Sequence, residues 1–278
     1  MNIQRILACA ALLALPALAQ QPKIYNTVKT KLKEGKQVIG GTVLSADPEI
    51  YCAMANSGFD YMWIEMQHSP LNFHEVANML RACKGSSAIP FIRVPDATEG
   101  DIQKATDIGA LGIILPMVES VEKVKNAVKF AKYPPIGARS QGNGQYGVLW
   151  GADYRQTAND NIMIVAMIES PKGVEIASQI ADIPGVDVVF VASTDLGSFS
   201  GLKQGDPKYE ALVKRIHDAT LKSGLKLGGP HAWLKRPDFH FFQSSGESGI
   251  IRAGVQSILA AEQNKKAPGK AEIEGSEK

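Results

Sequence analysis

Short apolar runs alternate with amphipathic stretches along most of the chain, and no shift in composition marks a second domain. The runs have the length of strands, and the stretches between them space apolar residues three and four apart, as on one face of a helix. We therefore predict strands at 38–43, 61–65, 88–93, 112–115, 162–168, 186–191, 225–228 and 239–243. Helices are predicted between them at 48–57, 72–84, 99–108, 120–131, 172–182, 206–223 and 247–263.

This alternation predicts an α/β fold in a single domain, a parallel (β/α)₈ TIM barrel. Two connections are irregular. Residues 132–161 are long and rich in Pro and Gly, with one short helix expected near Asp153, and no clear helix follows Gly228. Because long loops in compact domains are often functional, we interpret 132–161 as a candidate lid over the active site.

The first residues have the pattern of an export signal. A short start with one positive charge at Arg5 precedes an almost wholly apolar run at 6–18, and Ala17-Leu18-Ala19 gives the small-x-small pattern of a cleavage site. The C-terminal residues alternate Lys, Glu and small side chains, which is typical of disorder. We expect a signal peptide at 1–19, the barrel at 20–264, a disordered tail at 265–278, and a periplasmic or secreted protein.

Composition narrows the possible partners. The formal net charge is +2, from 30 basic and 28 acidic residues, which does not indicate a nucleic-acid or membrane surface. No stretch after the export signal reaches the roughly 20 apolar residues of a membrane helix. Beyond Cys9 only Cys52 and Cys83 remain, too few for a disulfide scaffold or a thiolate-rich metal site. These two form either one bridge or two separate buried thiols.

Polar residues at the ends of the predicted strands are the candidate chemistry, because the active site of such a barrel lies at the carboxyl ends of its strands. Glu169 follows one strand and Asp195 follows the next, so both carboxylates reach one rim and can share a divalent cation. Arg93 ends another strand, and His68 follows a fourth. Each residue alone also fits a solvated rim, a turn or a structural ion pair. Together they favour a metal enzyme.

Asp107 adds a separate indication. It lies in the last turn of a predicted helix, just before Gly109, where the helix dipole disfavours a negative charge. A nearby cation would compensate, and an imidazolium at His68 would also gain basicity from the carboxylate. The hypothesis is a His68–Asp107 pair; the alternative is a solvated carboxylate at a helix end.

Other short motifs of known functions occur in the chain, but the neighbouring residues do not fit those functions. Residues 142–147 fit G-x-G-x-x-G, but no apolar strand precedes them, so dinucleotide binding is not indicated. Residues 197–201 carry Phe199 where a serine hydrolase needs its nucleophile. His74, His217 and His240 lack metal-ligand spacing and are predicted to have structural roles.

An ordered series of motifs resembles the HpcH/HpaI family of class II pyruvate aldolases over residues 32–259. The series comprises Gly58-Phe59-Asp60-Tyr61, Glu65-Met66-Gln67-His68-Ser69-Pro70, Pro90-Phe91-Ile92-Arg93-Val94-Pro95, Asp107-Ile108-Gly109-Ala110, Gly112-Ile113-Ile114-Leu115-Pro116, Tyr133-Pro134-Pro135-Ile136-Gly137-Ala138-Arg139, Ile168-Glu169 and Asp195-Leu196. The resemblance implies a barrel of the pyruvate/phosphoenolpyruvate-binding superfamily. It also implies a metal-dependent carbon–carbon lyase that cleaves a 4-hydroxy-2-oxo acid into pyruvate or a similar 2-oxo acid and an aldehyde, through a metal-bound enolate.

The resemblance also implies roles for individual residues. Glu169 and Asp195 would hold Mg²⁺ or Mn²⁺, with Co²⁺ as a further option. Arg93 would stabilise the enolate, and His68 paired with Asp107 would be the acid/base group. Backbone amides around Ser193, Thr194 and Asp195 would bind the substrate carboxylate. Similar aldolases assemble as trimers or hexamers, so a homo-oligomer is expected.

The sequence departs from the family pattern in three places. Gln67 stands where the family typically has Glu beside the metal's waters, Ser140 follows Arg139 in place of Gly, and Ala192-Ser193 replaces Gly-Pro. Two alternatives to the aldolase therefore stay open. One is a citrate-lyase-like acyl-CoA lyase or a decarboxylase of the same superfamily, and the other is a secreted barrel that binds an oxo acid without turnover.

Overall fold

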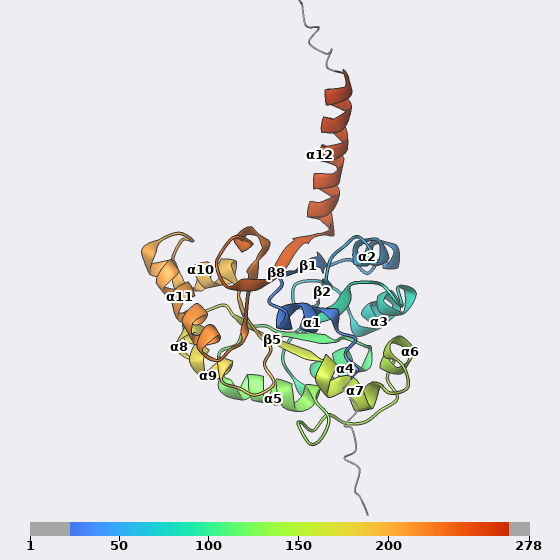
Figure 1. The fold of residues 1–278 in the computed structure, drawn as a ribbon, viewed down its shortest axis with the longest axis vertical. Helices are drawn as coiled ribbons and strands as arrows, with labels where there is room; N and C mark the ends of the chain where they lie inside the picture. The colour runs from blue at the N-terminus through green and yellow to red at the C-terminus, as the bar shows by residue number, and fades with distance from the viewer. Residues whose placement is uncertain (1–22, 267–278) are drawn as a thin grey trace, which may run out of the picture.

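Eight parallel strands form one closed barrel in the computed structural model, which describes residues 23–266 (Figure 1). The fold predicted from the sequence, a single-domain α/β barrel, is confirmed. The expected signal peptide at 1–19 lies outside the described residues, as does 267–278 of the expected tail. The strands are β1 (Val38–Val43), β2 (Tyr61–Glu65), β3 (Ile89–Arg93), β4 (Gly112–Leu115), β5 (Met163–Ile168), β6 (Val188–Val191), β7 (Lys226–Pro230) and β8 (Phe239–Gly246).

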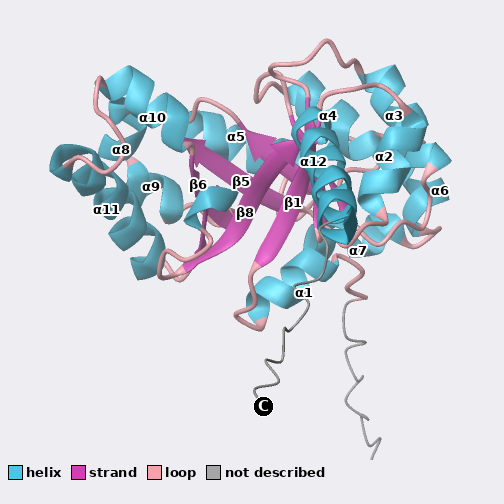
Figure 2. Cartoon of the chain, turned by 90° about the horizontal axis from the view of Figure 1, so that it is seen from above, coloured by secondary structure: helices cyan, strands magenta, loops and turns pink. Residues whose placement is uncertain are grey.

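Helices surround the strands (Figure 2). Several begin at side-chain caps, as where Asn72 and Glu75 form a capping box at the start of α3. The helices are α1 (Thr27–Lys33), α2 (Pro48–Ala55), α3 (Phe73–Ala82), α4 (Glu99–Asp107), α5 (Val121–Ala131), α6 (Tyr146–Trp150), α7 (Tyr154–Asn161), α8 (Pro171–Glu175), α9 (Ala177–Ala181), α10 (Ser193–Ser200), α11 (Pro207–Lys222) and α12 (Glu247–Lys266), with a 3₁₀ turn η1 (His231–Trp233). The predicted helix at 172–182 is therefore two short helices, and α1, α6 and α10 were not predicted.

Aromatic side chains fill the inside of the barrel. Tyr61 lies against Phe91 and Phe241, with ring centroids 4.9 and 4.4 Å apart. This packing requires glycine on neighbouring strands, because a Cβ on Gly40 would lie 2.2 Å from the Tyr61 ring and one on Gly112 would lie 1.8 Å from Phe91. A close-packed interior fixes the strand ends, and the strand ends carry the site.

The register of the strands decides which residues meet at the rim. Glu65 pairs with Arg93 at the ends of β2 and β3. Ile168 pairs with Val191, so Glu169 lies one residue past the end of β5 and Asp195 four residues past the end of β6. The candidate residues therefore reach the same end of the barrel.

Residues 132–161 do not form a lid over this rim, so that prediction is wrong. A helix that follows a strand runs back toward the start of the next strand, and α5 therefore delivers this connection to the opposite end of the barrel (Figure 1). There it folds into α6 and α7, and Trp150 Nε1 donates to the carbonyl of Gly109 at 2.8 Å, just before β4.

Cys52 and Cys83 form a disulfide between α2 and the end of α3, with their Cα atoms 5.3 Å apart. The structure thus decides between the two interpretations that the sequence left open. Within residues 23–266, no helix has both the length and the apolar character needed to cross a membrane.

Candidate active site

A buried ion pair between Glu65 and Arg93 organises the rim. The side chains are 1% and 7% exposed, and Arg93 Nε lies 2.5 Å from Glu65 Oε2. The same oxygen accepts a hydrogen bond from Trp63 Nε1 at 3.1 Å. Glu65 Oε1 accepts from the backbone N–H groups of Gln67 and His68, at 2.8 and 3.0 Å. Glu65 therefore holds both the arginine and the loop that carries His68.

The sequence analysis gave no role to Glu65, although the structure places it at the centre of the rim. Its signal was present in the sequence, because a carboxylate ends the apolar run of β2 beside the arginine that ends β3. A buried charge requires a partner, and neighbouring parallel strands bring their last residues together. The sequence therefore contained enough information to pair Glu65 with Arg93.

A pocket of about 150 Å³ opens at the rim beside this pair. The His68 side chain lines it and makes no hydrogen bond to any other residue that the structure describes. The structure brings together several of the residues predicted from the sequence. The lining comprises His68, Arg93, Ser193, Thr194 and Asp195, with Met167, Phe190, Ala192, Pro230 and Gln243.

Glu169 does not line the pocket; its side chain is buried at the end of β5 and is 2% exposed. Its Oε2 accepts from the N–H of Met117 at 3.1 Å, and Met117 adopts a left-handed φ of 49°. Burial raises the pKa of Glu169 to about 7, and the negative charge of Asp195 adds to this, whereas the Met117 N–H and the charge of Arg93 act in the opposite direction. Burial and Asp195 thus both favour a proton or a cation at Glu169.

Two buried oxygen atoms at the rim have no hydrogen-bond partner in the part of the chain that the structure describes: Oε1 of Glu169 and Oε1 of Gln67. Both are acceptors, so a cation or a water held by one would satisfy them. No cluster of three or more His, Cys, Asp or Glu side chains suited to a metal occurs within residues 23–266. The carboxylates of Glu169 and Asp195 are near enough for the charge of Asp195 to raise the pKa of Glu169, and two such ligands fit a hard divalent cation whose other ligands are waters and substrate oxygens.

Helix α10 begins at the pocket. Its first residues, Ser193 and Thr194, line the pocket, and the N-cap residue Ala192 makes no side-chain cap. The first N–H groups of a helix have no acceptor within the helix, so this end offers donors to an anion. The backbone of Ser193 is fixed in position, because its carbonyl accepts a hydrogen bond from the Tyr209 hydroxyl at 2.9 Å.

The expected His68–Asp107 pair is wrong within this chain. Helix α4 runs from the rim toward the start of β4, so Asp107 in its last turn lies at the opposite end of the barrel from His68. Asp107 instead binds Arg139 Nη2 at 2.7 Å and Gln103 Nε2 at 2.8 Å. Arg139 is the cation that compensates the helix dipole, and its guanidinium is itself 4.6 Å from the Tyr133 ring centroid.

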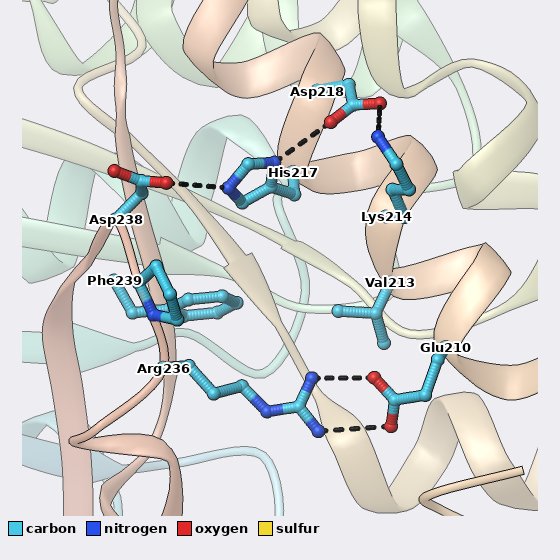
Figure 3. A pocket seen from close by; sticks show the side chains of 9 residues that line it. Glu210, Val213, Lys214, His217, Asp218, Arg236, Asp238 and Phe239 are labelled. Atoms are coloured by element: carbon cyan, nitrogen blue, oxygen red, sulfur yellow. Dashed lines mark hydrogen bonds and ion pairs between the residues drawn. The ribbon is translucent and has the colours of Figure 1, made fainter. Parts of the chain in front are cut away.

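A second cavity, of about 410 Å³, lies on the outer flank of the barrel between α11 and the segment before β8 (Figure 3). Its charged side chains bind one another. Arg236 forms two bonds to Glu210, at 2.7 and 3.1 Å, and His217 lies between Asp218 and Asp238, at 3.0 and 3.1 Å. Its charges are paired with one another, and it meets the barrel at Phe239, the first residue of β8, at the end opposite the rim. This cavity is therefore not the catalytic site.

Comparison with known proteins identifies the relatives of this architecture. A sequence model of the HpcH/HpaI aldolase/citrate lyase family matches residues 42–226. A hydroxypyruvate/pyruvate aldolase of Paraburkholderia phytofirmans is 33% identical over 73% of this chain and 82% of its own length. A 4-hydroxy-2-oxovalerate aldolase of Novosphingobium aromaticivorans is 32% identical over 85% of this chain and 90% of its own.

Solved structures agree with this. The crystal structure of an HpcH/HpaI aldolase/citrate lyase family protein from Burkholderia cenocepacia superposes with a TM-score of 0.77, at 26% identity, over 85% of this chain and 99% of its own. The citrate synthase SbnG superposes with a TM-score of 0.73, at 29% identity, over 85% of this chain and 97% of its own.

Proposed function

The chain belongs to the HpcH/HpaI aldolase/citrate lyase family and is a class II aldolase, and we propose that it cleaves a 4-hydroxy-2-oxo acid into pyruvate or a similar 2-oxo acid and an aldehyde. The observation that carries this proposal is the buried, unpartnered Oε1 of Glu169, close enough to Asp195 for that charge to raise its pKa. A barrel that only packed its own residues would not leave a carboxylate oxygen in this state.

Glu169 and Asp195 are the residues that would hold the divalent cation, Mg²⁺ or Mn²⁺, with Co²⁺ as a further possibility. When bound, such an ion acts as a Lewis acid that polarises the keto group of the substrate. Gln67 would contact a water of the ion through its amide oxygen, which has no hydrogen-bond partner among the described residues. An amide accepts this hydrogen bond but brings no negative charge, so the site carries less charge than one with Glu at this position.

Arg93 stabilises the negative charge that develops on the keto oxygen when the carbon–carbon bond breaks. Glu65 binds the Nε side of the guanidinium, which leaves other N–H donors of Arg93 for the substrate in the pocket. Because Glu65 is itself fixed by Trp63 and by two backbone N–H groups, Arg93 needs little reorganisation during the reaction.

His68 accepts the proton of the 4-hydroxyl group as the bond breaks, and it returns a proton in the reverse direction. Its ring makes no bond to other described residues, so either nitrogen can face the pocket. The substrate carboxylate would lie at the start of α10, on the N–H groups around Ser193 and Thr194.

The test is a lyase assay with the purified chain. With Mn²⁺ and a series of 4-hydroxy-2-oxo acids we expect release of pyruvate or a related 2-oxo acid, loss of activity with a chelator, and recovery on adding Mn²⁺. An acyl-CoA thioester as the only accepted substrate would instead favour a citrate-lyase-like activity. Binding of pyruvate without turnover of any of these compounds would favour a non-catalytic oxo-acid-binding barrel.

We also propose that the protein is exported and acts in the periplasm or outside the cell. The pattern of residues 1–19 supports this, and so does the disulfide between Cys52 and Cys83, because disulfides persist mainly in oxidising compartments. Expression of the whole chain in a bacterium, followed by cell fractionation and N-terminal sequencing, tests it. A periplasmic protein beginning near Gln20 is expected; a cytoplasmic protein that retains residues 1–19 would contradict export.

A further inference from the structure

Gln243 lines the pocket at the rim, and no step of the proposed reaction uses it. It lies on β8, where it pairs with Pro230 of β7 and with Gly40 of β1. Its side chain is half-buried. The cation, the enolate, the 4-hydroxyl group and the substrate carboxylate are all assigned to other residues of the rim. The Gln243 amide is therefore available to another part of the substrate.

Hydrogen bonds fix the orientation of this amide. Thr42 Oγ1 lies 2.7 Å from the Ser244 carbonyl, which can only accept, so the Thr42 hydroxyl donates to it. The Gln243 amide lies 3.3 Å from the same Thr42 oxygen, whose one proton is already used. The amide atom at that position is therefore the nitrogen Nε2, because an amide oxygen there would face a second acceptor.

The amide oxygen of Gln243 is the end that a molecule in the pocket can use. Oε1 accepts no hydrogen bond from any other residue between 23 and 266, whereas Nε2 is turned toward Thr42 on β1. A carbonyl oxygen accepts hydrogen bonds and donates none. Gln243 therefore suits a ligand group that carries a proton on oxygen or nitrogen.

The order of the strands shows which part of the substrate meets this oxygen. The proposed reaction places the 2-oxo acid between Arg93 after β3 and the start of α10 after β6, with the 4-hydroxyl group at His68 after β2. The remaining arc of the barrel, from β6 through β7, β8 and β1 to β2, carries Pro230 and Gln243 in the pocket wall. The fragment that leaves as the aldehyde extends from the 4-hydroxyl carbon toward this arc.

We propose that Gln243 selects aldehydes that carry a hydroxyl group on the carbon next to the carbonyl, by accepting a hydrogen bond from that hydroxyl through Oε1. Thr42 is a positioning residue, because it holds the amide with its nitrogen away from the substrate. An alkyl group in place of the hydroxyl would cover the amide oxygen without offering it a proton. This inference rests on the proposed function and adds the class of aldehyde.

The experiment compares two aldehydes of nearly equal size in the condensation with pyruvate, which is the reverse of cleavage. Glycolaldehyde has a hydroxyl group where propanal has a methyl group. At saturating pyruvate and Mn²⁺, kcat/KM for the two aldehydes gives a ratio, and comparing this ratio between variants cancels their different intrinsic reactivity. Gln243→Met keeps the length of the side chain without the amide, and we expect it to lower the glycolaldehyde-to-propanal ratio about tenfold.

Variants of Thr42 test the orientation of the amide. Thr42→Val removes the hydroxyl at nearly constant size, so the amide can turn its nitrogen toward the pocket, and the ratio should fall about threefold. Thr42→Ser keeps the hydroxyl and should keep the ratio. The matched control is Gln156→Met, an exposed glutamine of α7 at the other end of the barrel, which should also keep the ratio.

Methoxyacetaldehyde tests the direction of the hydrogen bond. Its ether oxygen accepts but cannot donate, so the unmodified chain should use it no better than propanal. If Gln243→Met impairs the use of methoxyacetaldehyde as much as that of glycolaldehyde, the N–H of the amide faces the substrate, and the inference is overturned.

The outcomes separate this inference from the proposed function. Turnover with the same glycolaldehyde-to-propanal ratio in Gln243→Met as in the unmodified chain overturns the inference alone. A ratio that falls in Gln243→Met but not in Thr42→Val removes the positioning role of Thr42. If the unmodified chain turns over none of the aldehydes and none of the 4-hydroxy-2-oxo acids, the proposed function is wrong and the inference falls with it.

Discussion

Each end of the barrel pairs a carboxylate with a buried arginine, but the two ends leave different polar atoms without a partner. At the end away from the rim, Arg139 binds Asp107 and is surrounded by the rings of Tyr133, Tyr146 and Tyr154. The buried groups there that have no hydrogen-bond partner among the described residues are the Arg139 Nε and the Tyr133 hydroxyl. At the rim, the atoms left without a partner are oxygen acceptors.

The two ends differ in whether the protein itself provides a cation for each carboxylate. The end away from the rim contains the cation that its carboxylate needs, and it also contains hydrogen-bond donors that have no acceptor among the described residues. At the rim Glu65 already engages Arg93, and two further carboxylates, Glu169 and Asp195, form no ion pair with any residue from 23 to 266. Buried oxygen acceptors beside a carboxylate of raised pKa, with Arg93 lining a pocket, indicate a site built for a ligand, whereas Arg139, enclosed by three tyrosine rings, indicates a structural site.

The largest effect expected from breaking this contrast is at Glu169. Glu169→Gln should lower kcat about a thousandfold, because it would remove a ligand of the proposed cation. Without metal, the variant should be at least as stable as the parent, since burial disfavours the charge that it removes. Steady-state kinetics with Mn²⁺ and thermal unfolding with and without metal measure both.

Glu210→Gln is the matched control, a carboxylate whose partner Arg236 lies on the outer flank of the barrel. It should keep kcat within about twofold, as is usual for changes away from a site. Full activity in Glu169→Gln would contradict the metal site.

Arg139→Met should have the next largest effect, on stability. It leaves Asp107 without its main partner and exposes three tyrosine rings to a vacated centre, so we expect the free energy of unfolding to fall by about 3 kcal/mol. Arg93→Met is the comparison: its main cost should be catalytic, about a hundredfold or more in kcat. Denaturant unfolding and kinetics on both variants separate the two roles, and equal losses of stability with equal activity would remove the contrast between the two ends.

A pH titration gives a smaller effect, about tenfold per unit. With a pKa of about 7, Glu169 holds a proton below neutral pH that a cation must displace, so the Kd of Mn²⁺ should rise about tenfold for each unit below pH 7 and level off above it. In the metal-free protein the sign is reversed for stability. The folded chain binds this proton more tightly than the unfolded chain, so stability should fall as pH rises from about 4.5 to about 7. Mn²⁺ titration by calorimetry measures the pH dependence of the Kd, and thermal unfolding of the metal-free protein measures the pH dependence of stability. Neither dependence should appear in Glu169→Gln.

The sequence was sufficient for most strands because β2 to β6 are short runs buried on both faces, and for the rim because strand ends of a parallel barrel share one edge. It also placed Arg93, Glu169 and Asp195 correctly at that edge. The His68–Asp107 pair and the lid failed for a single reason: spacing along the chain was used without the direction of the elements, and helices run opposite to the strands. Helix α10 was missed because the Asp before Leu196-Gly197 fits a turn equally well. The course of α12 depends on its surroundings in space, which a pattern of apolar residues does not describe.

The smallest effect expected is at Gln67, where this chain departs from its family. Gln67→Glu replaces a neutral acceptor without a partner by a carboxylate beside the waters of the proposed cation. We expect Mn²⁺ to bind several-fold more tightly, because a negative charge near a cation's waters strengthens their hydrogen bonds. The metal-free variant should lose some stability, since a fourth carboxylate joins a region where burial already raises the pKa of Glu169. Gln156→Glu, at an exposed position of α7, adds the same charge away from the rim and should change neither quantity. Unchanged Mn²⁺ affinity in Gln67→Glu would mean that residue 67 does not reach the waters of the cation, and that the unpartnered amide oxygen belongs to the packing of the loop after β2.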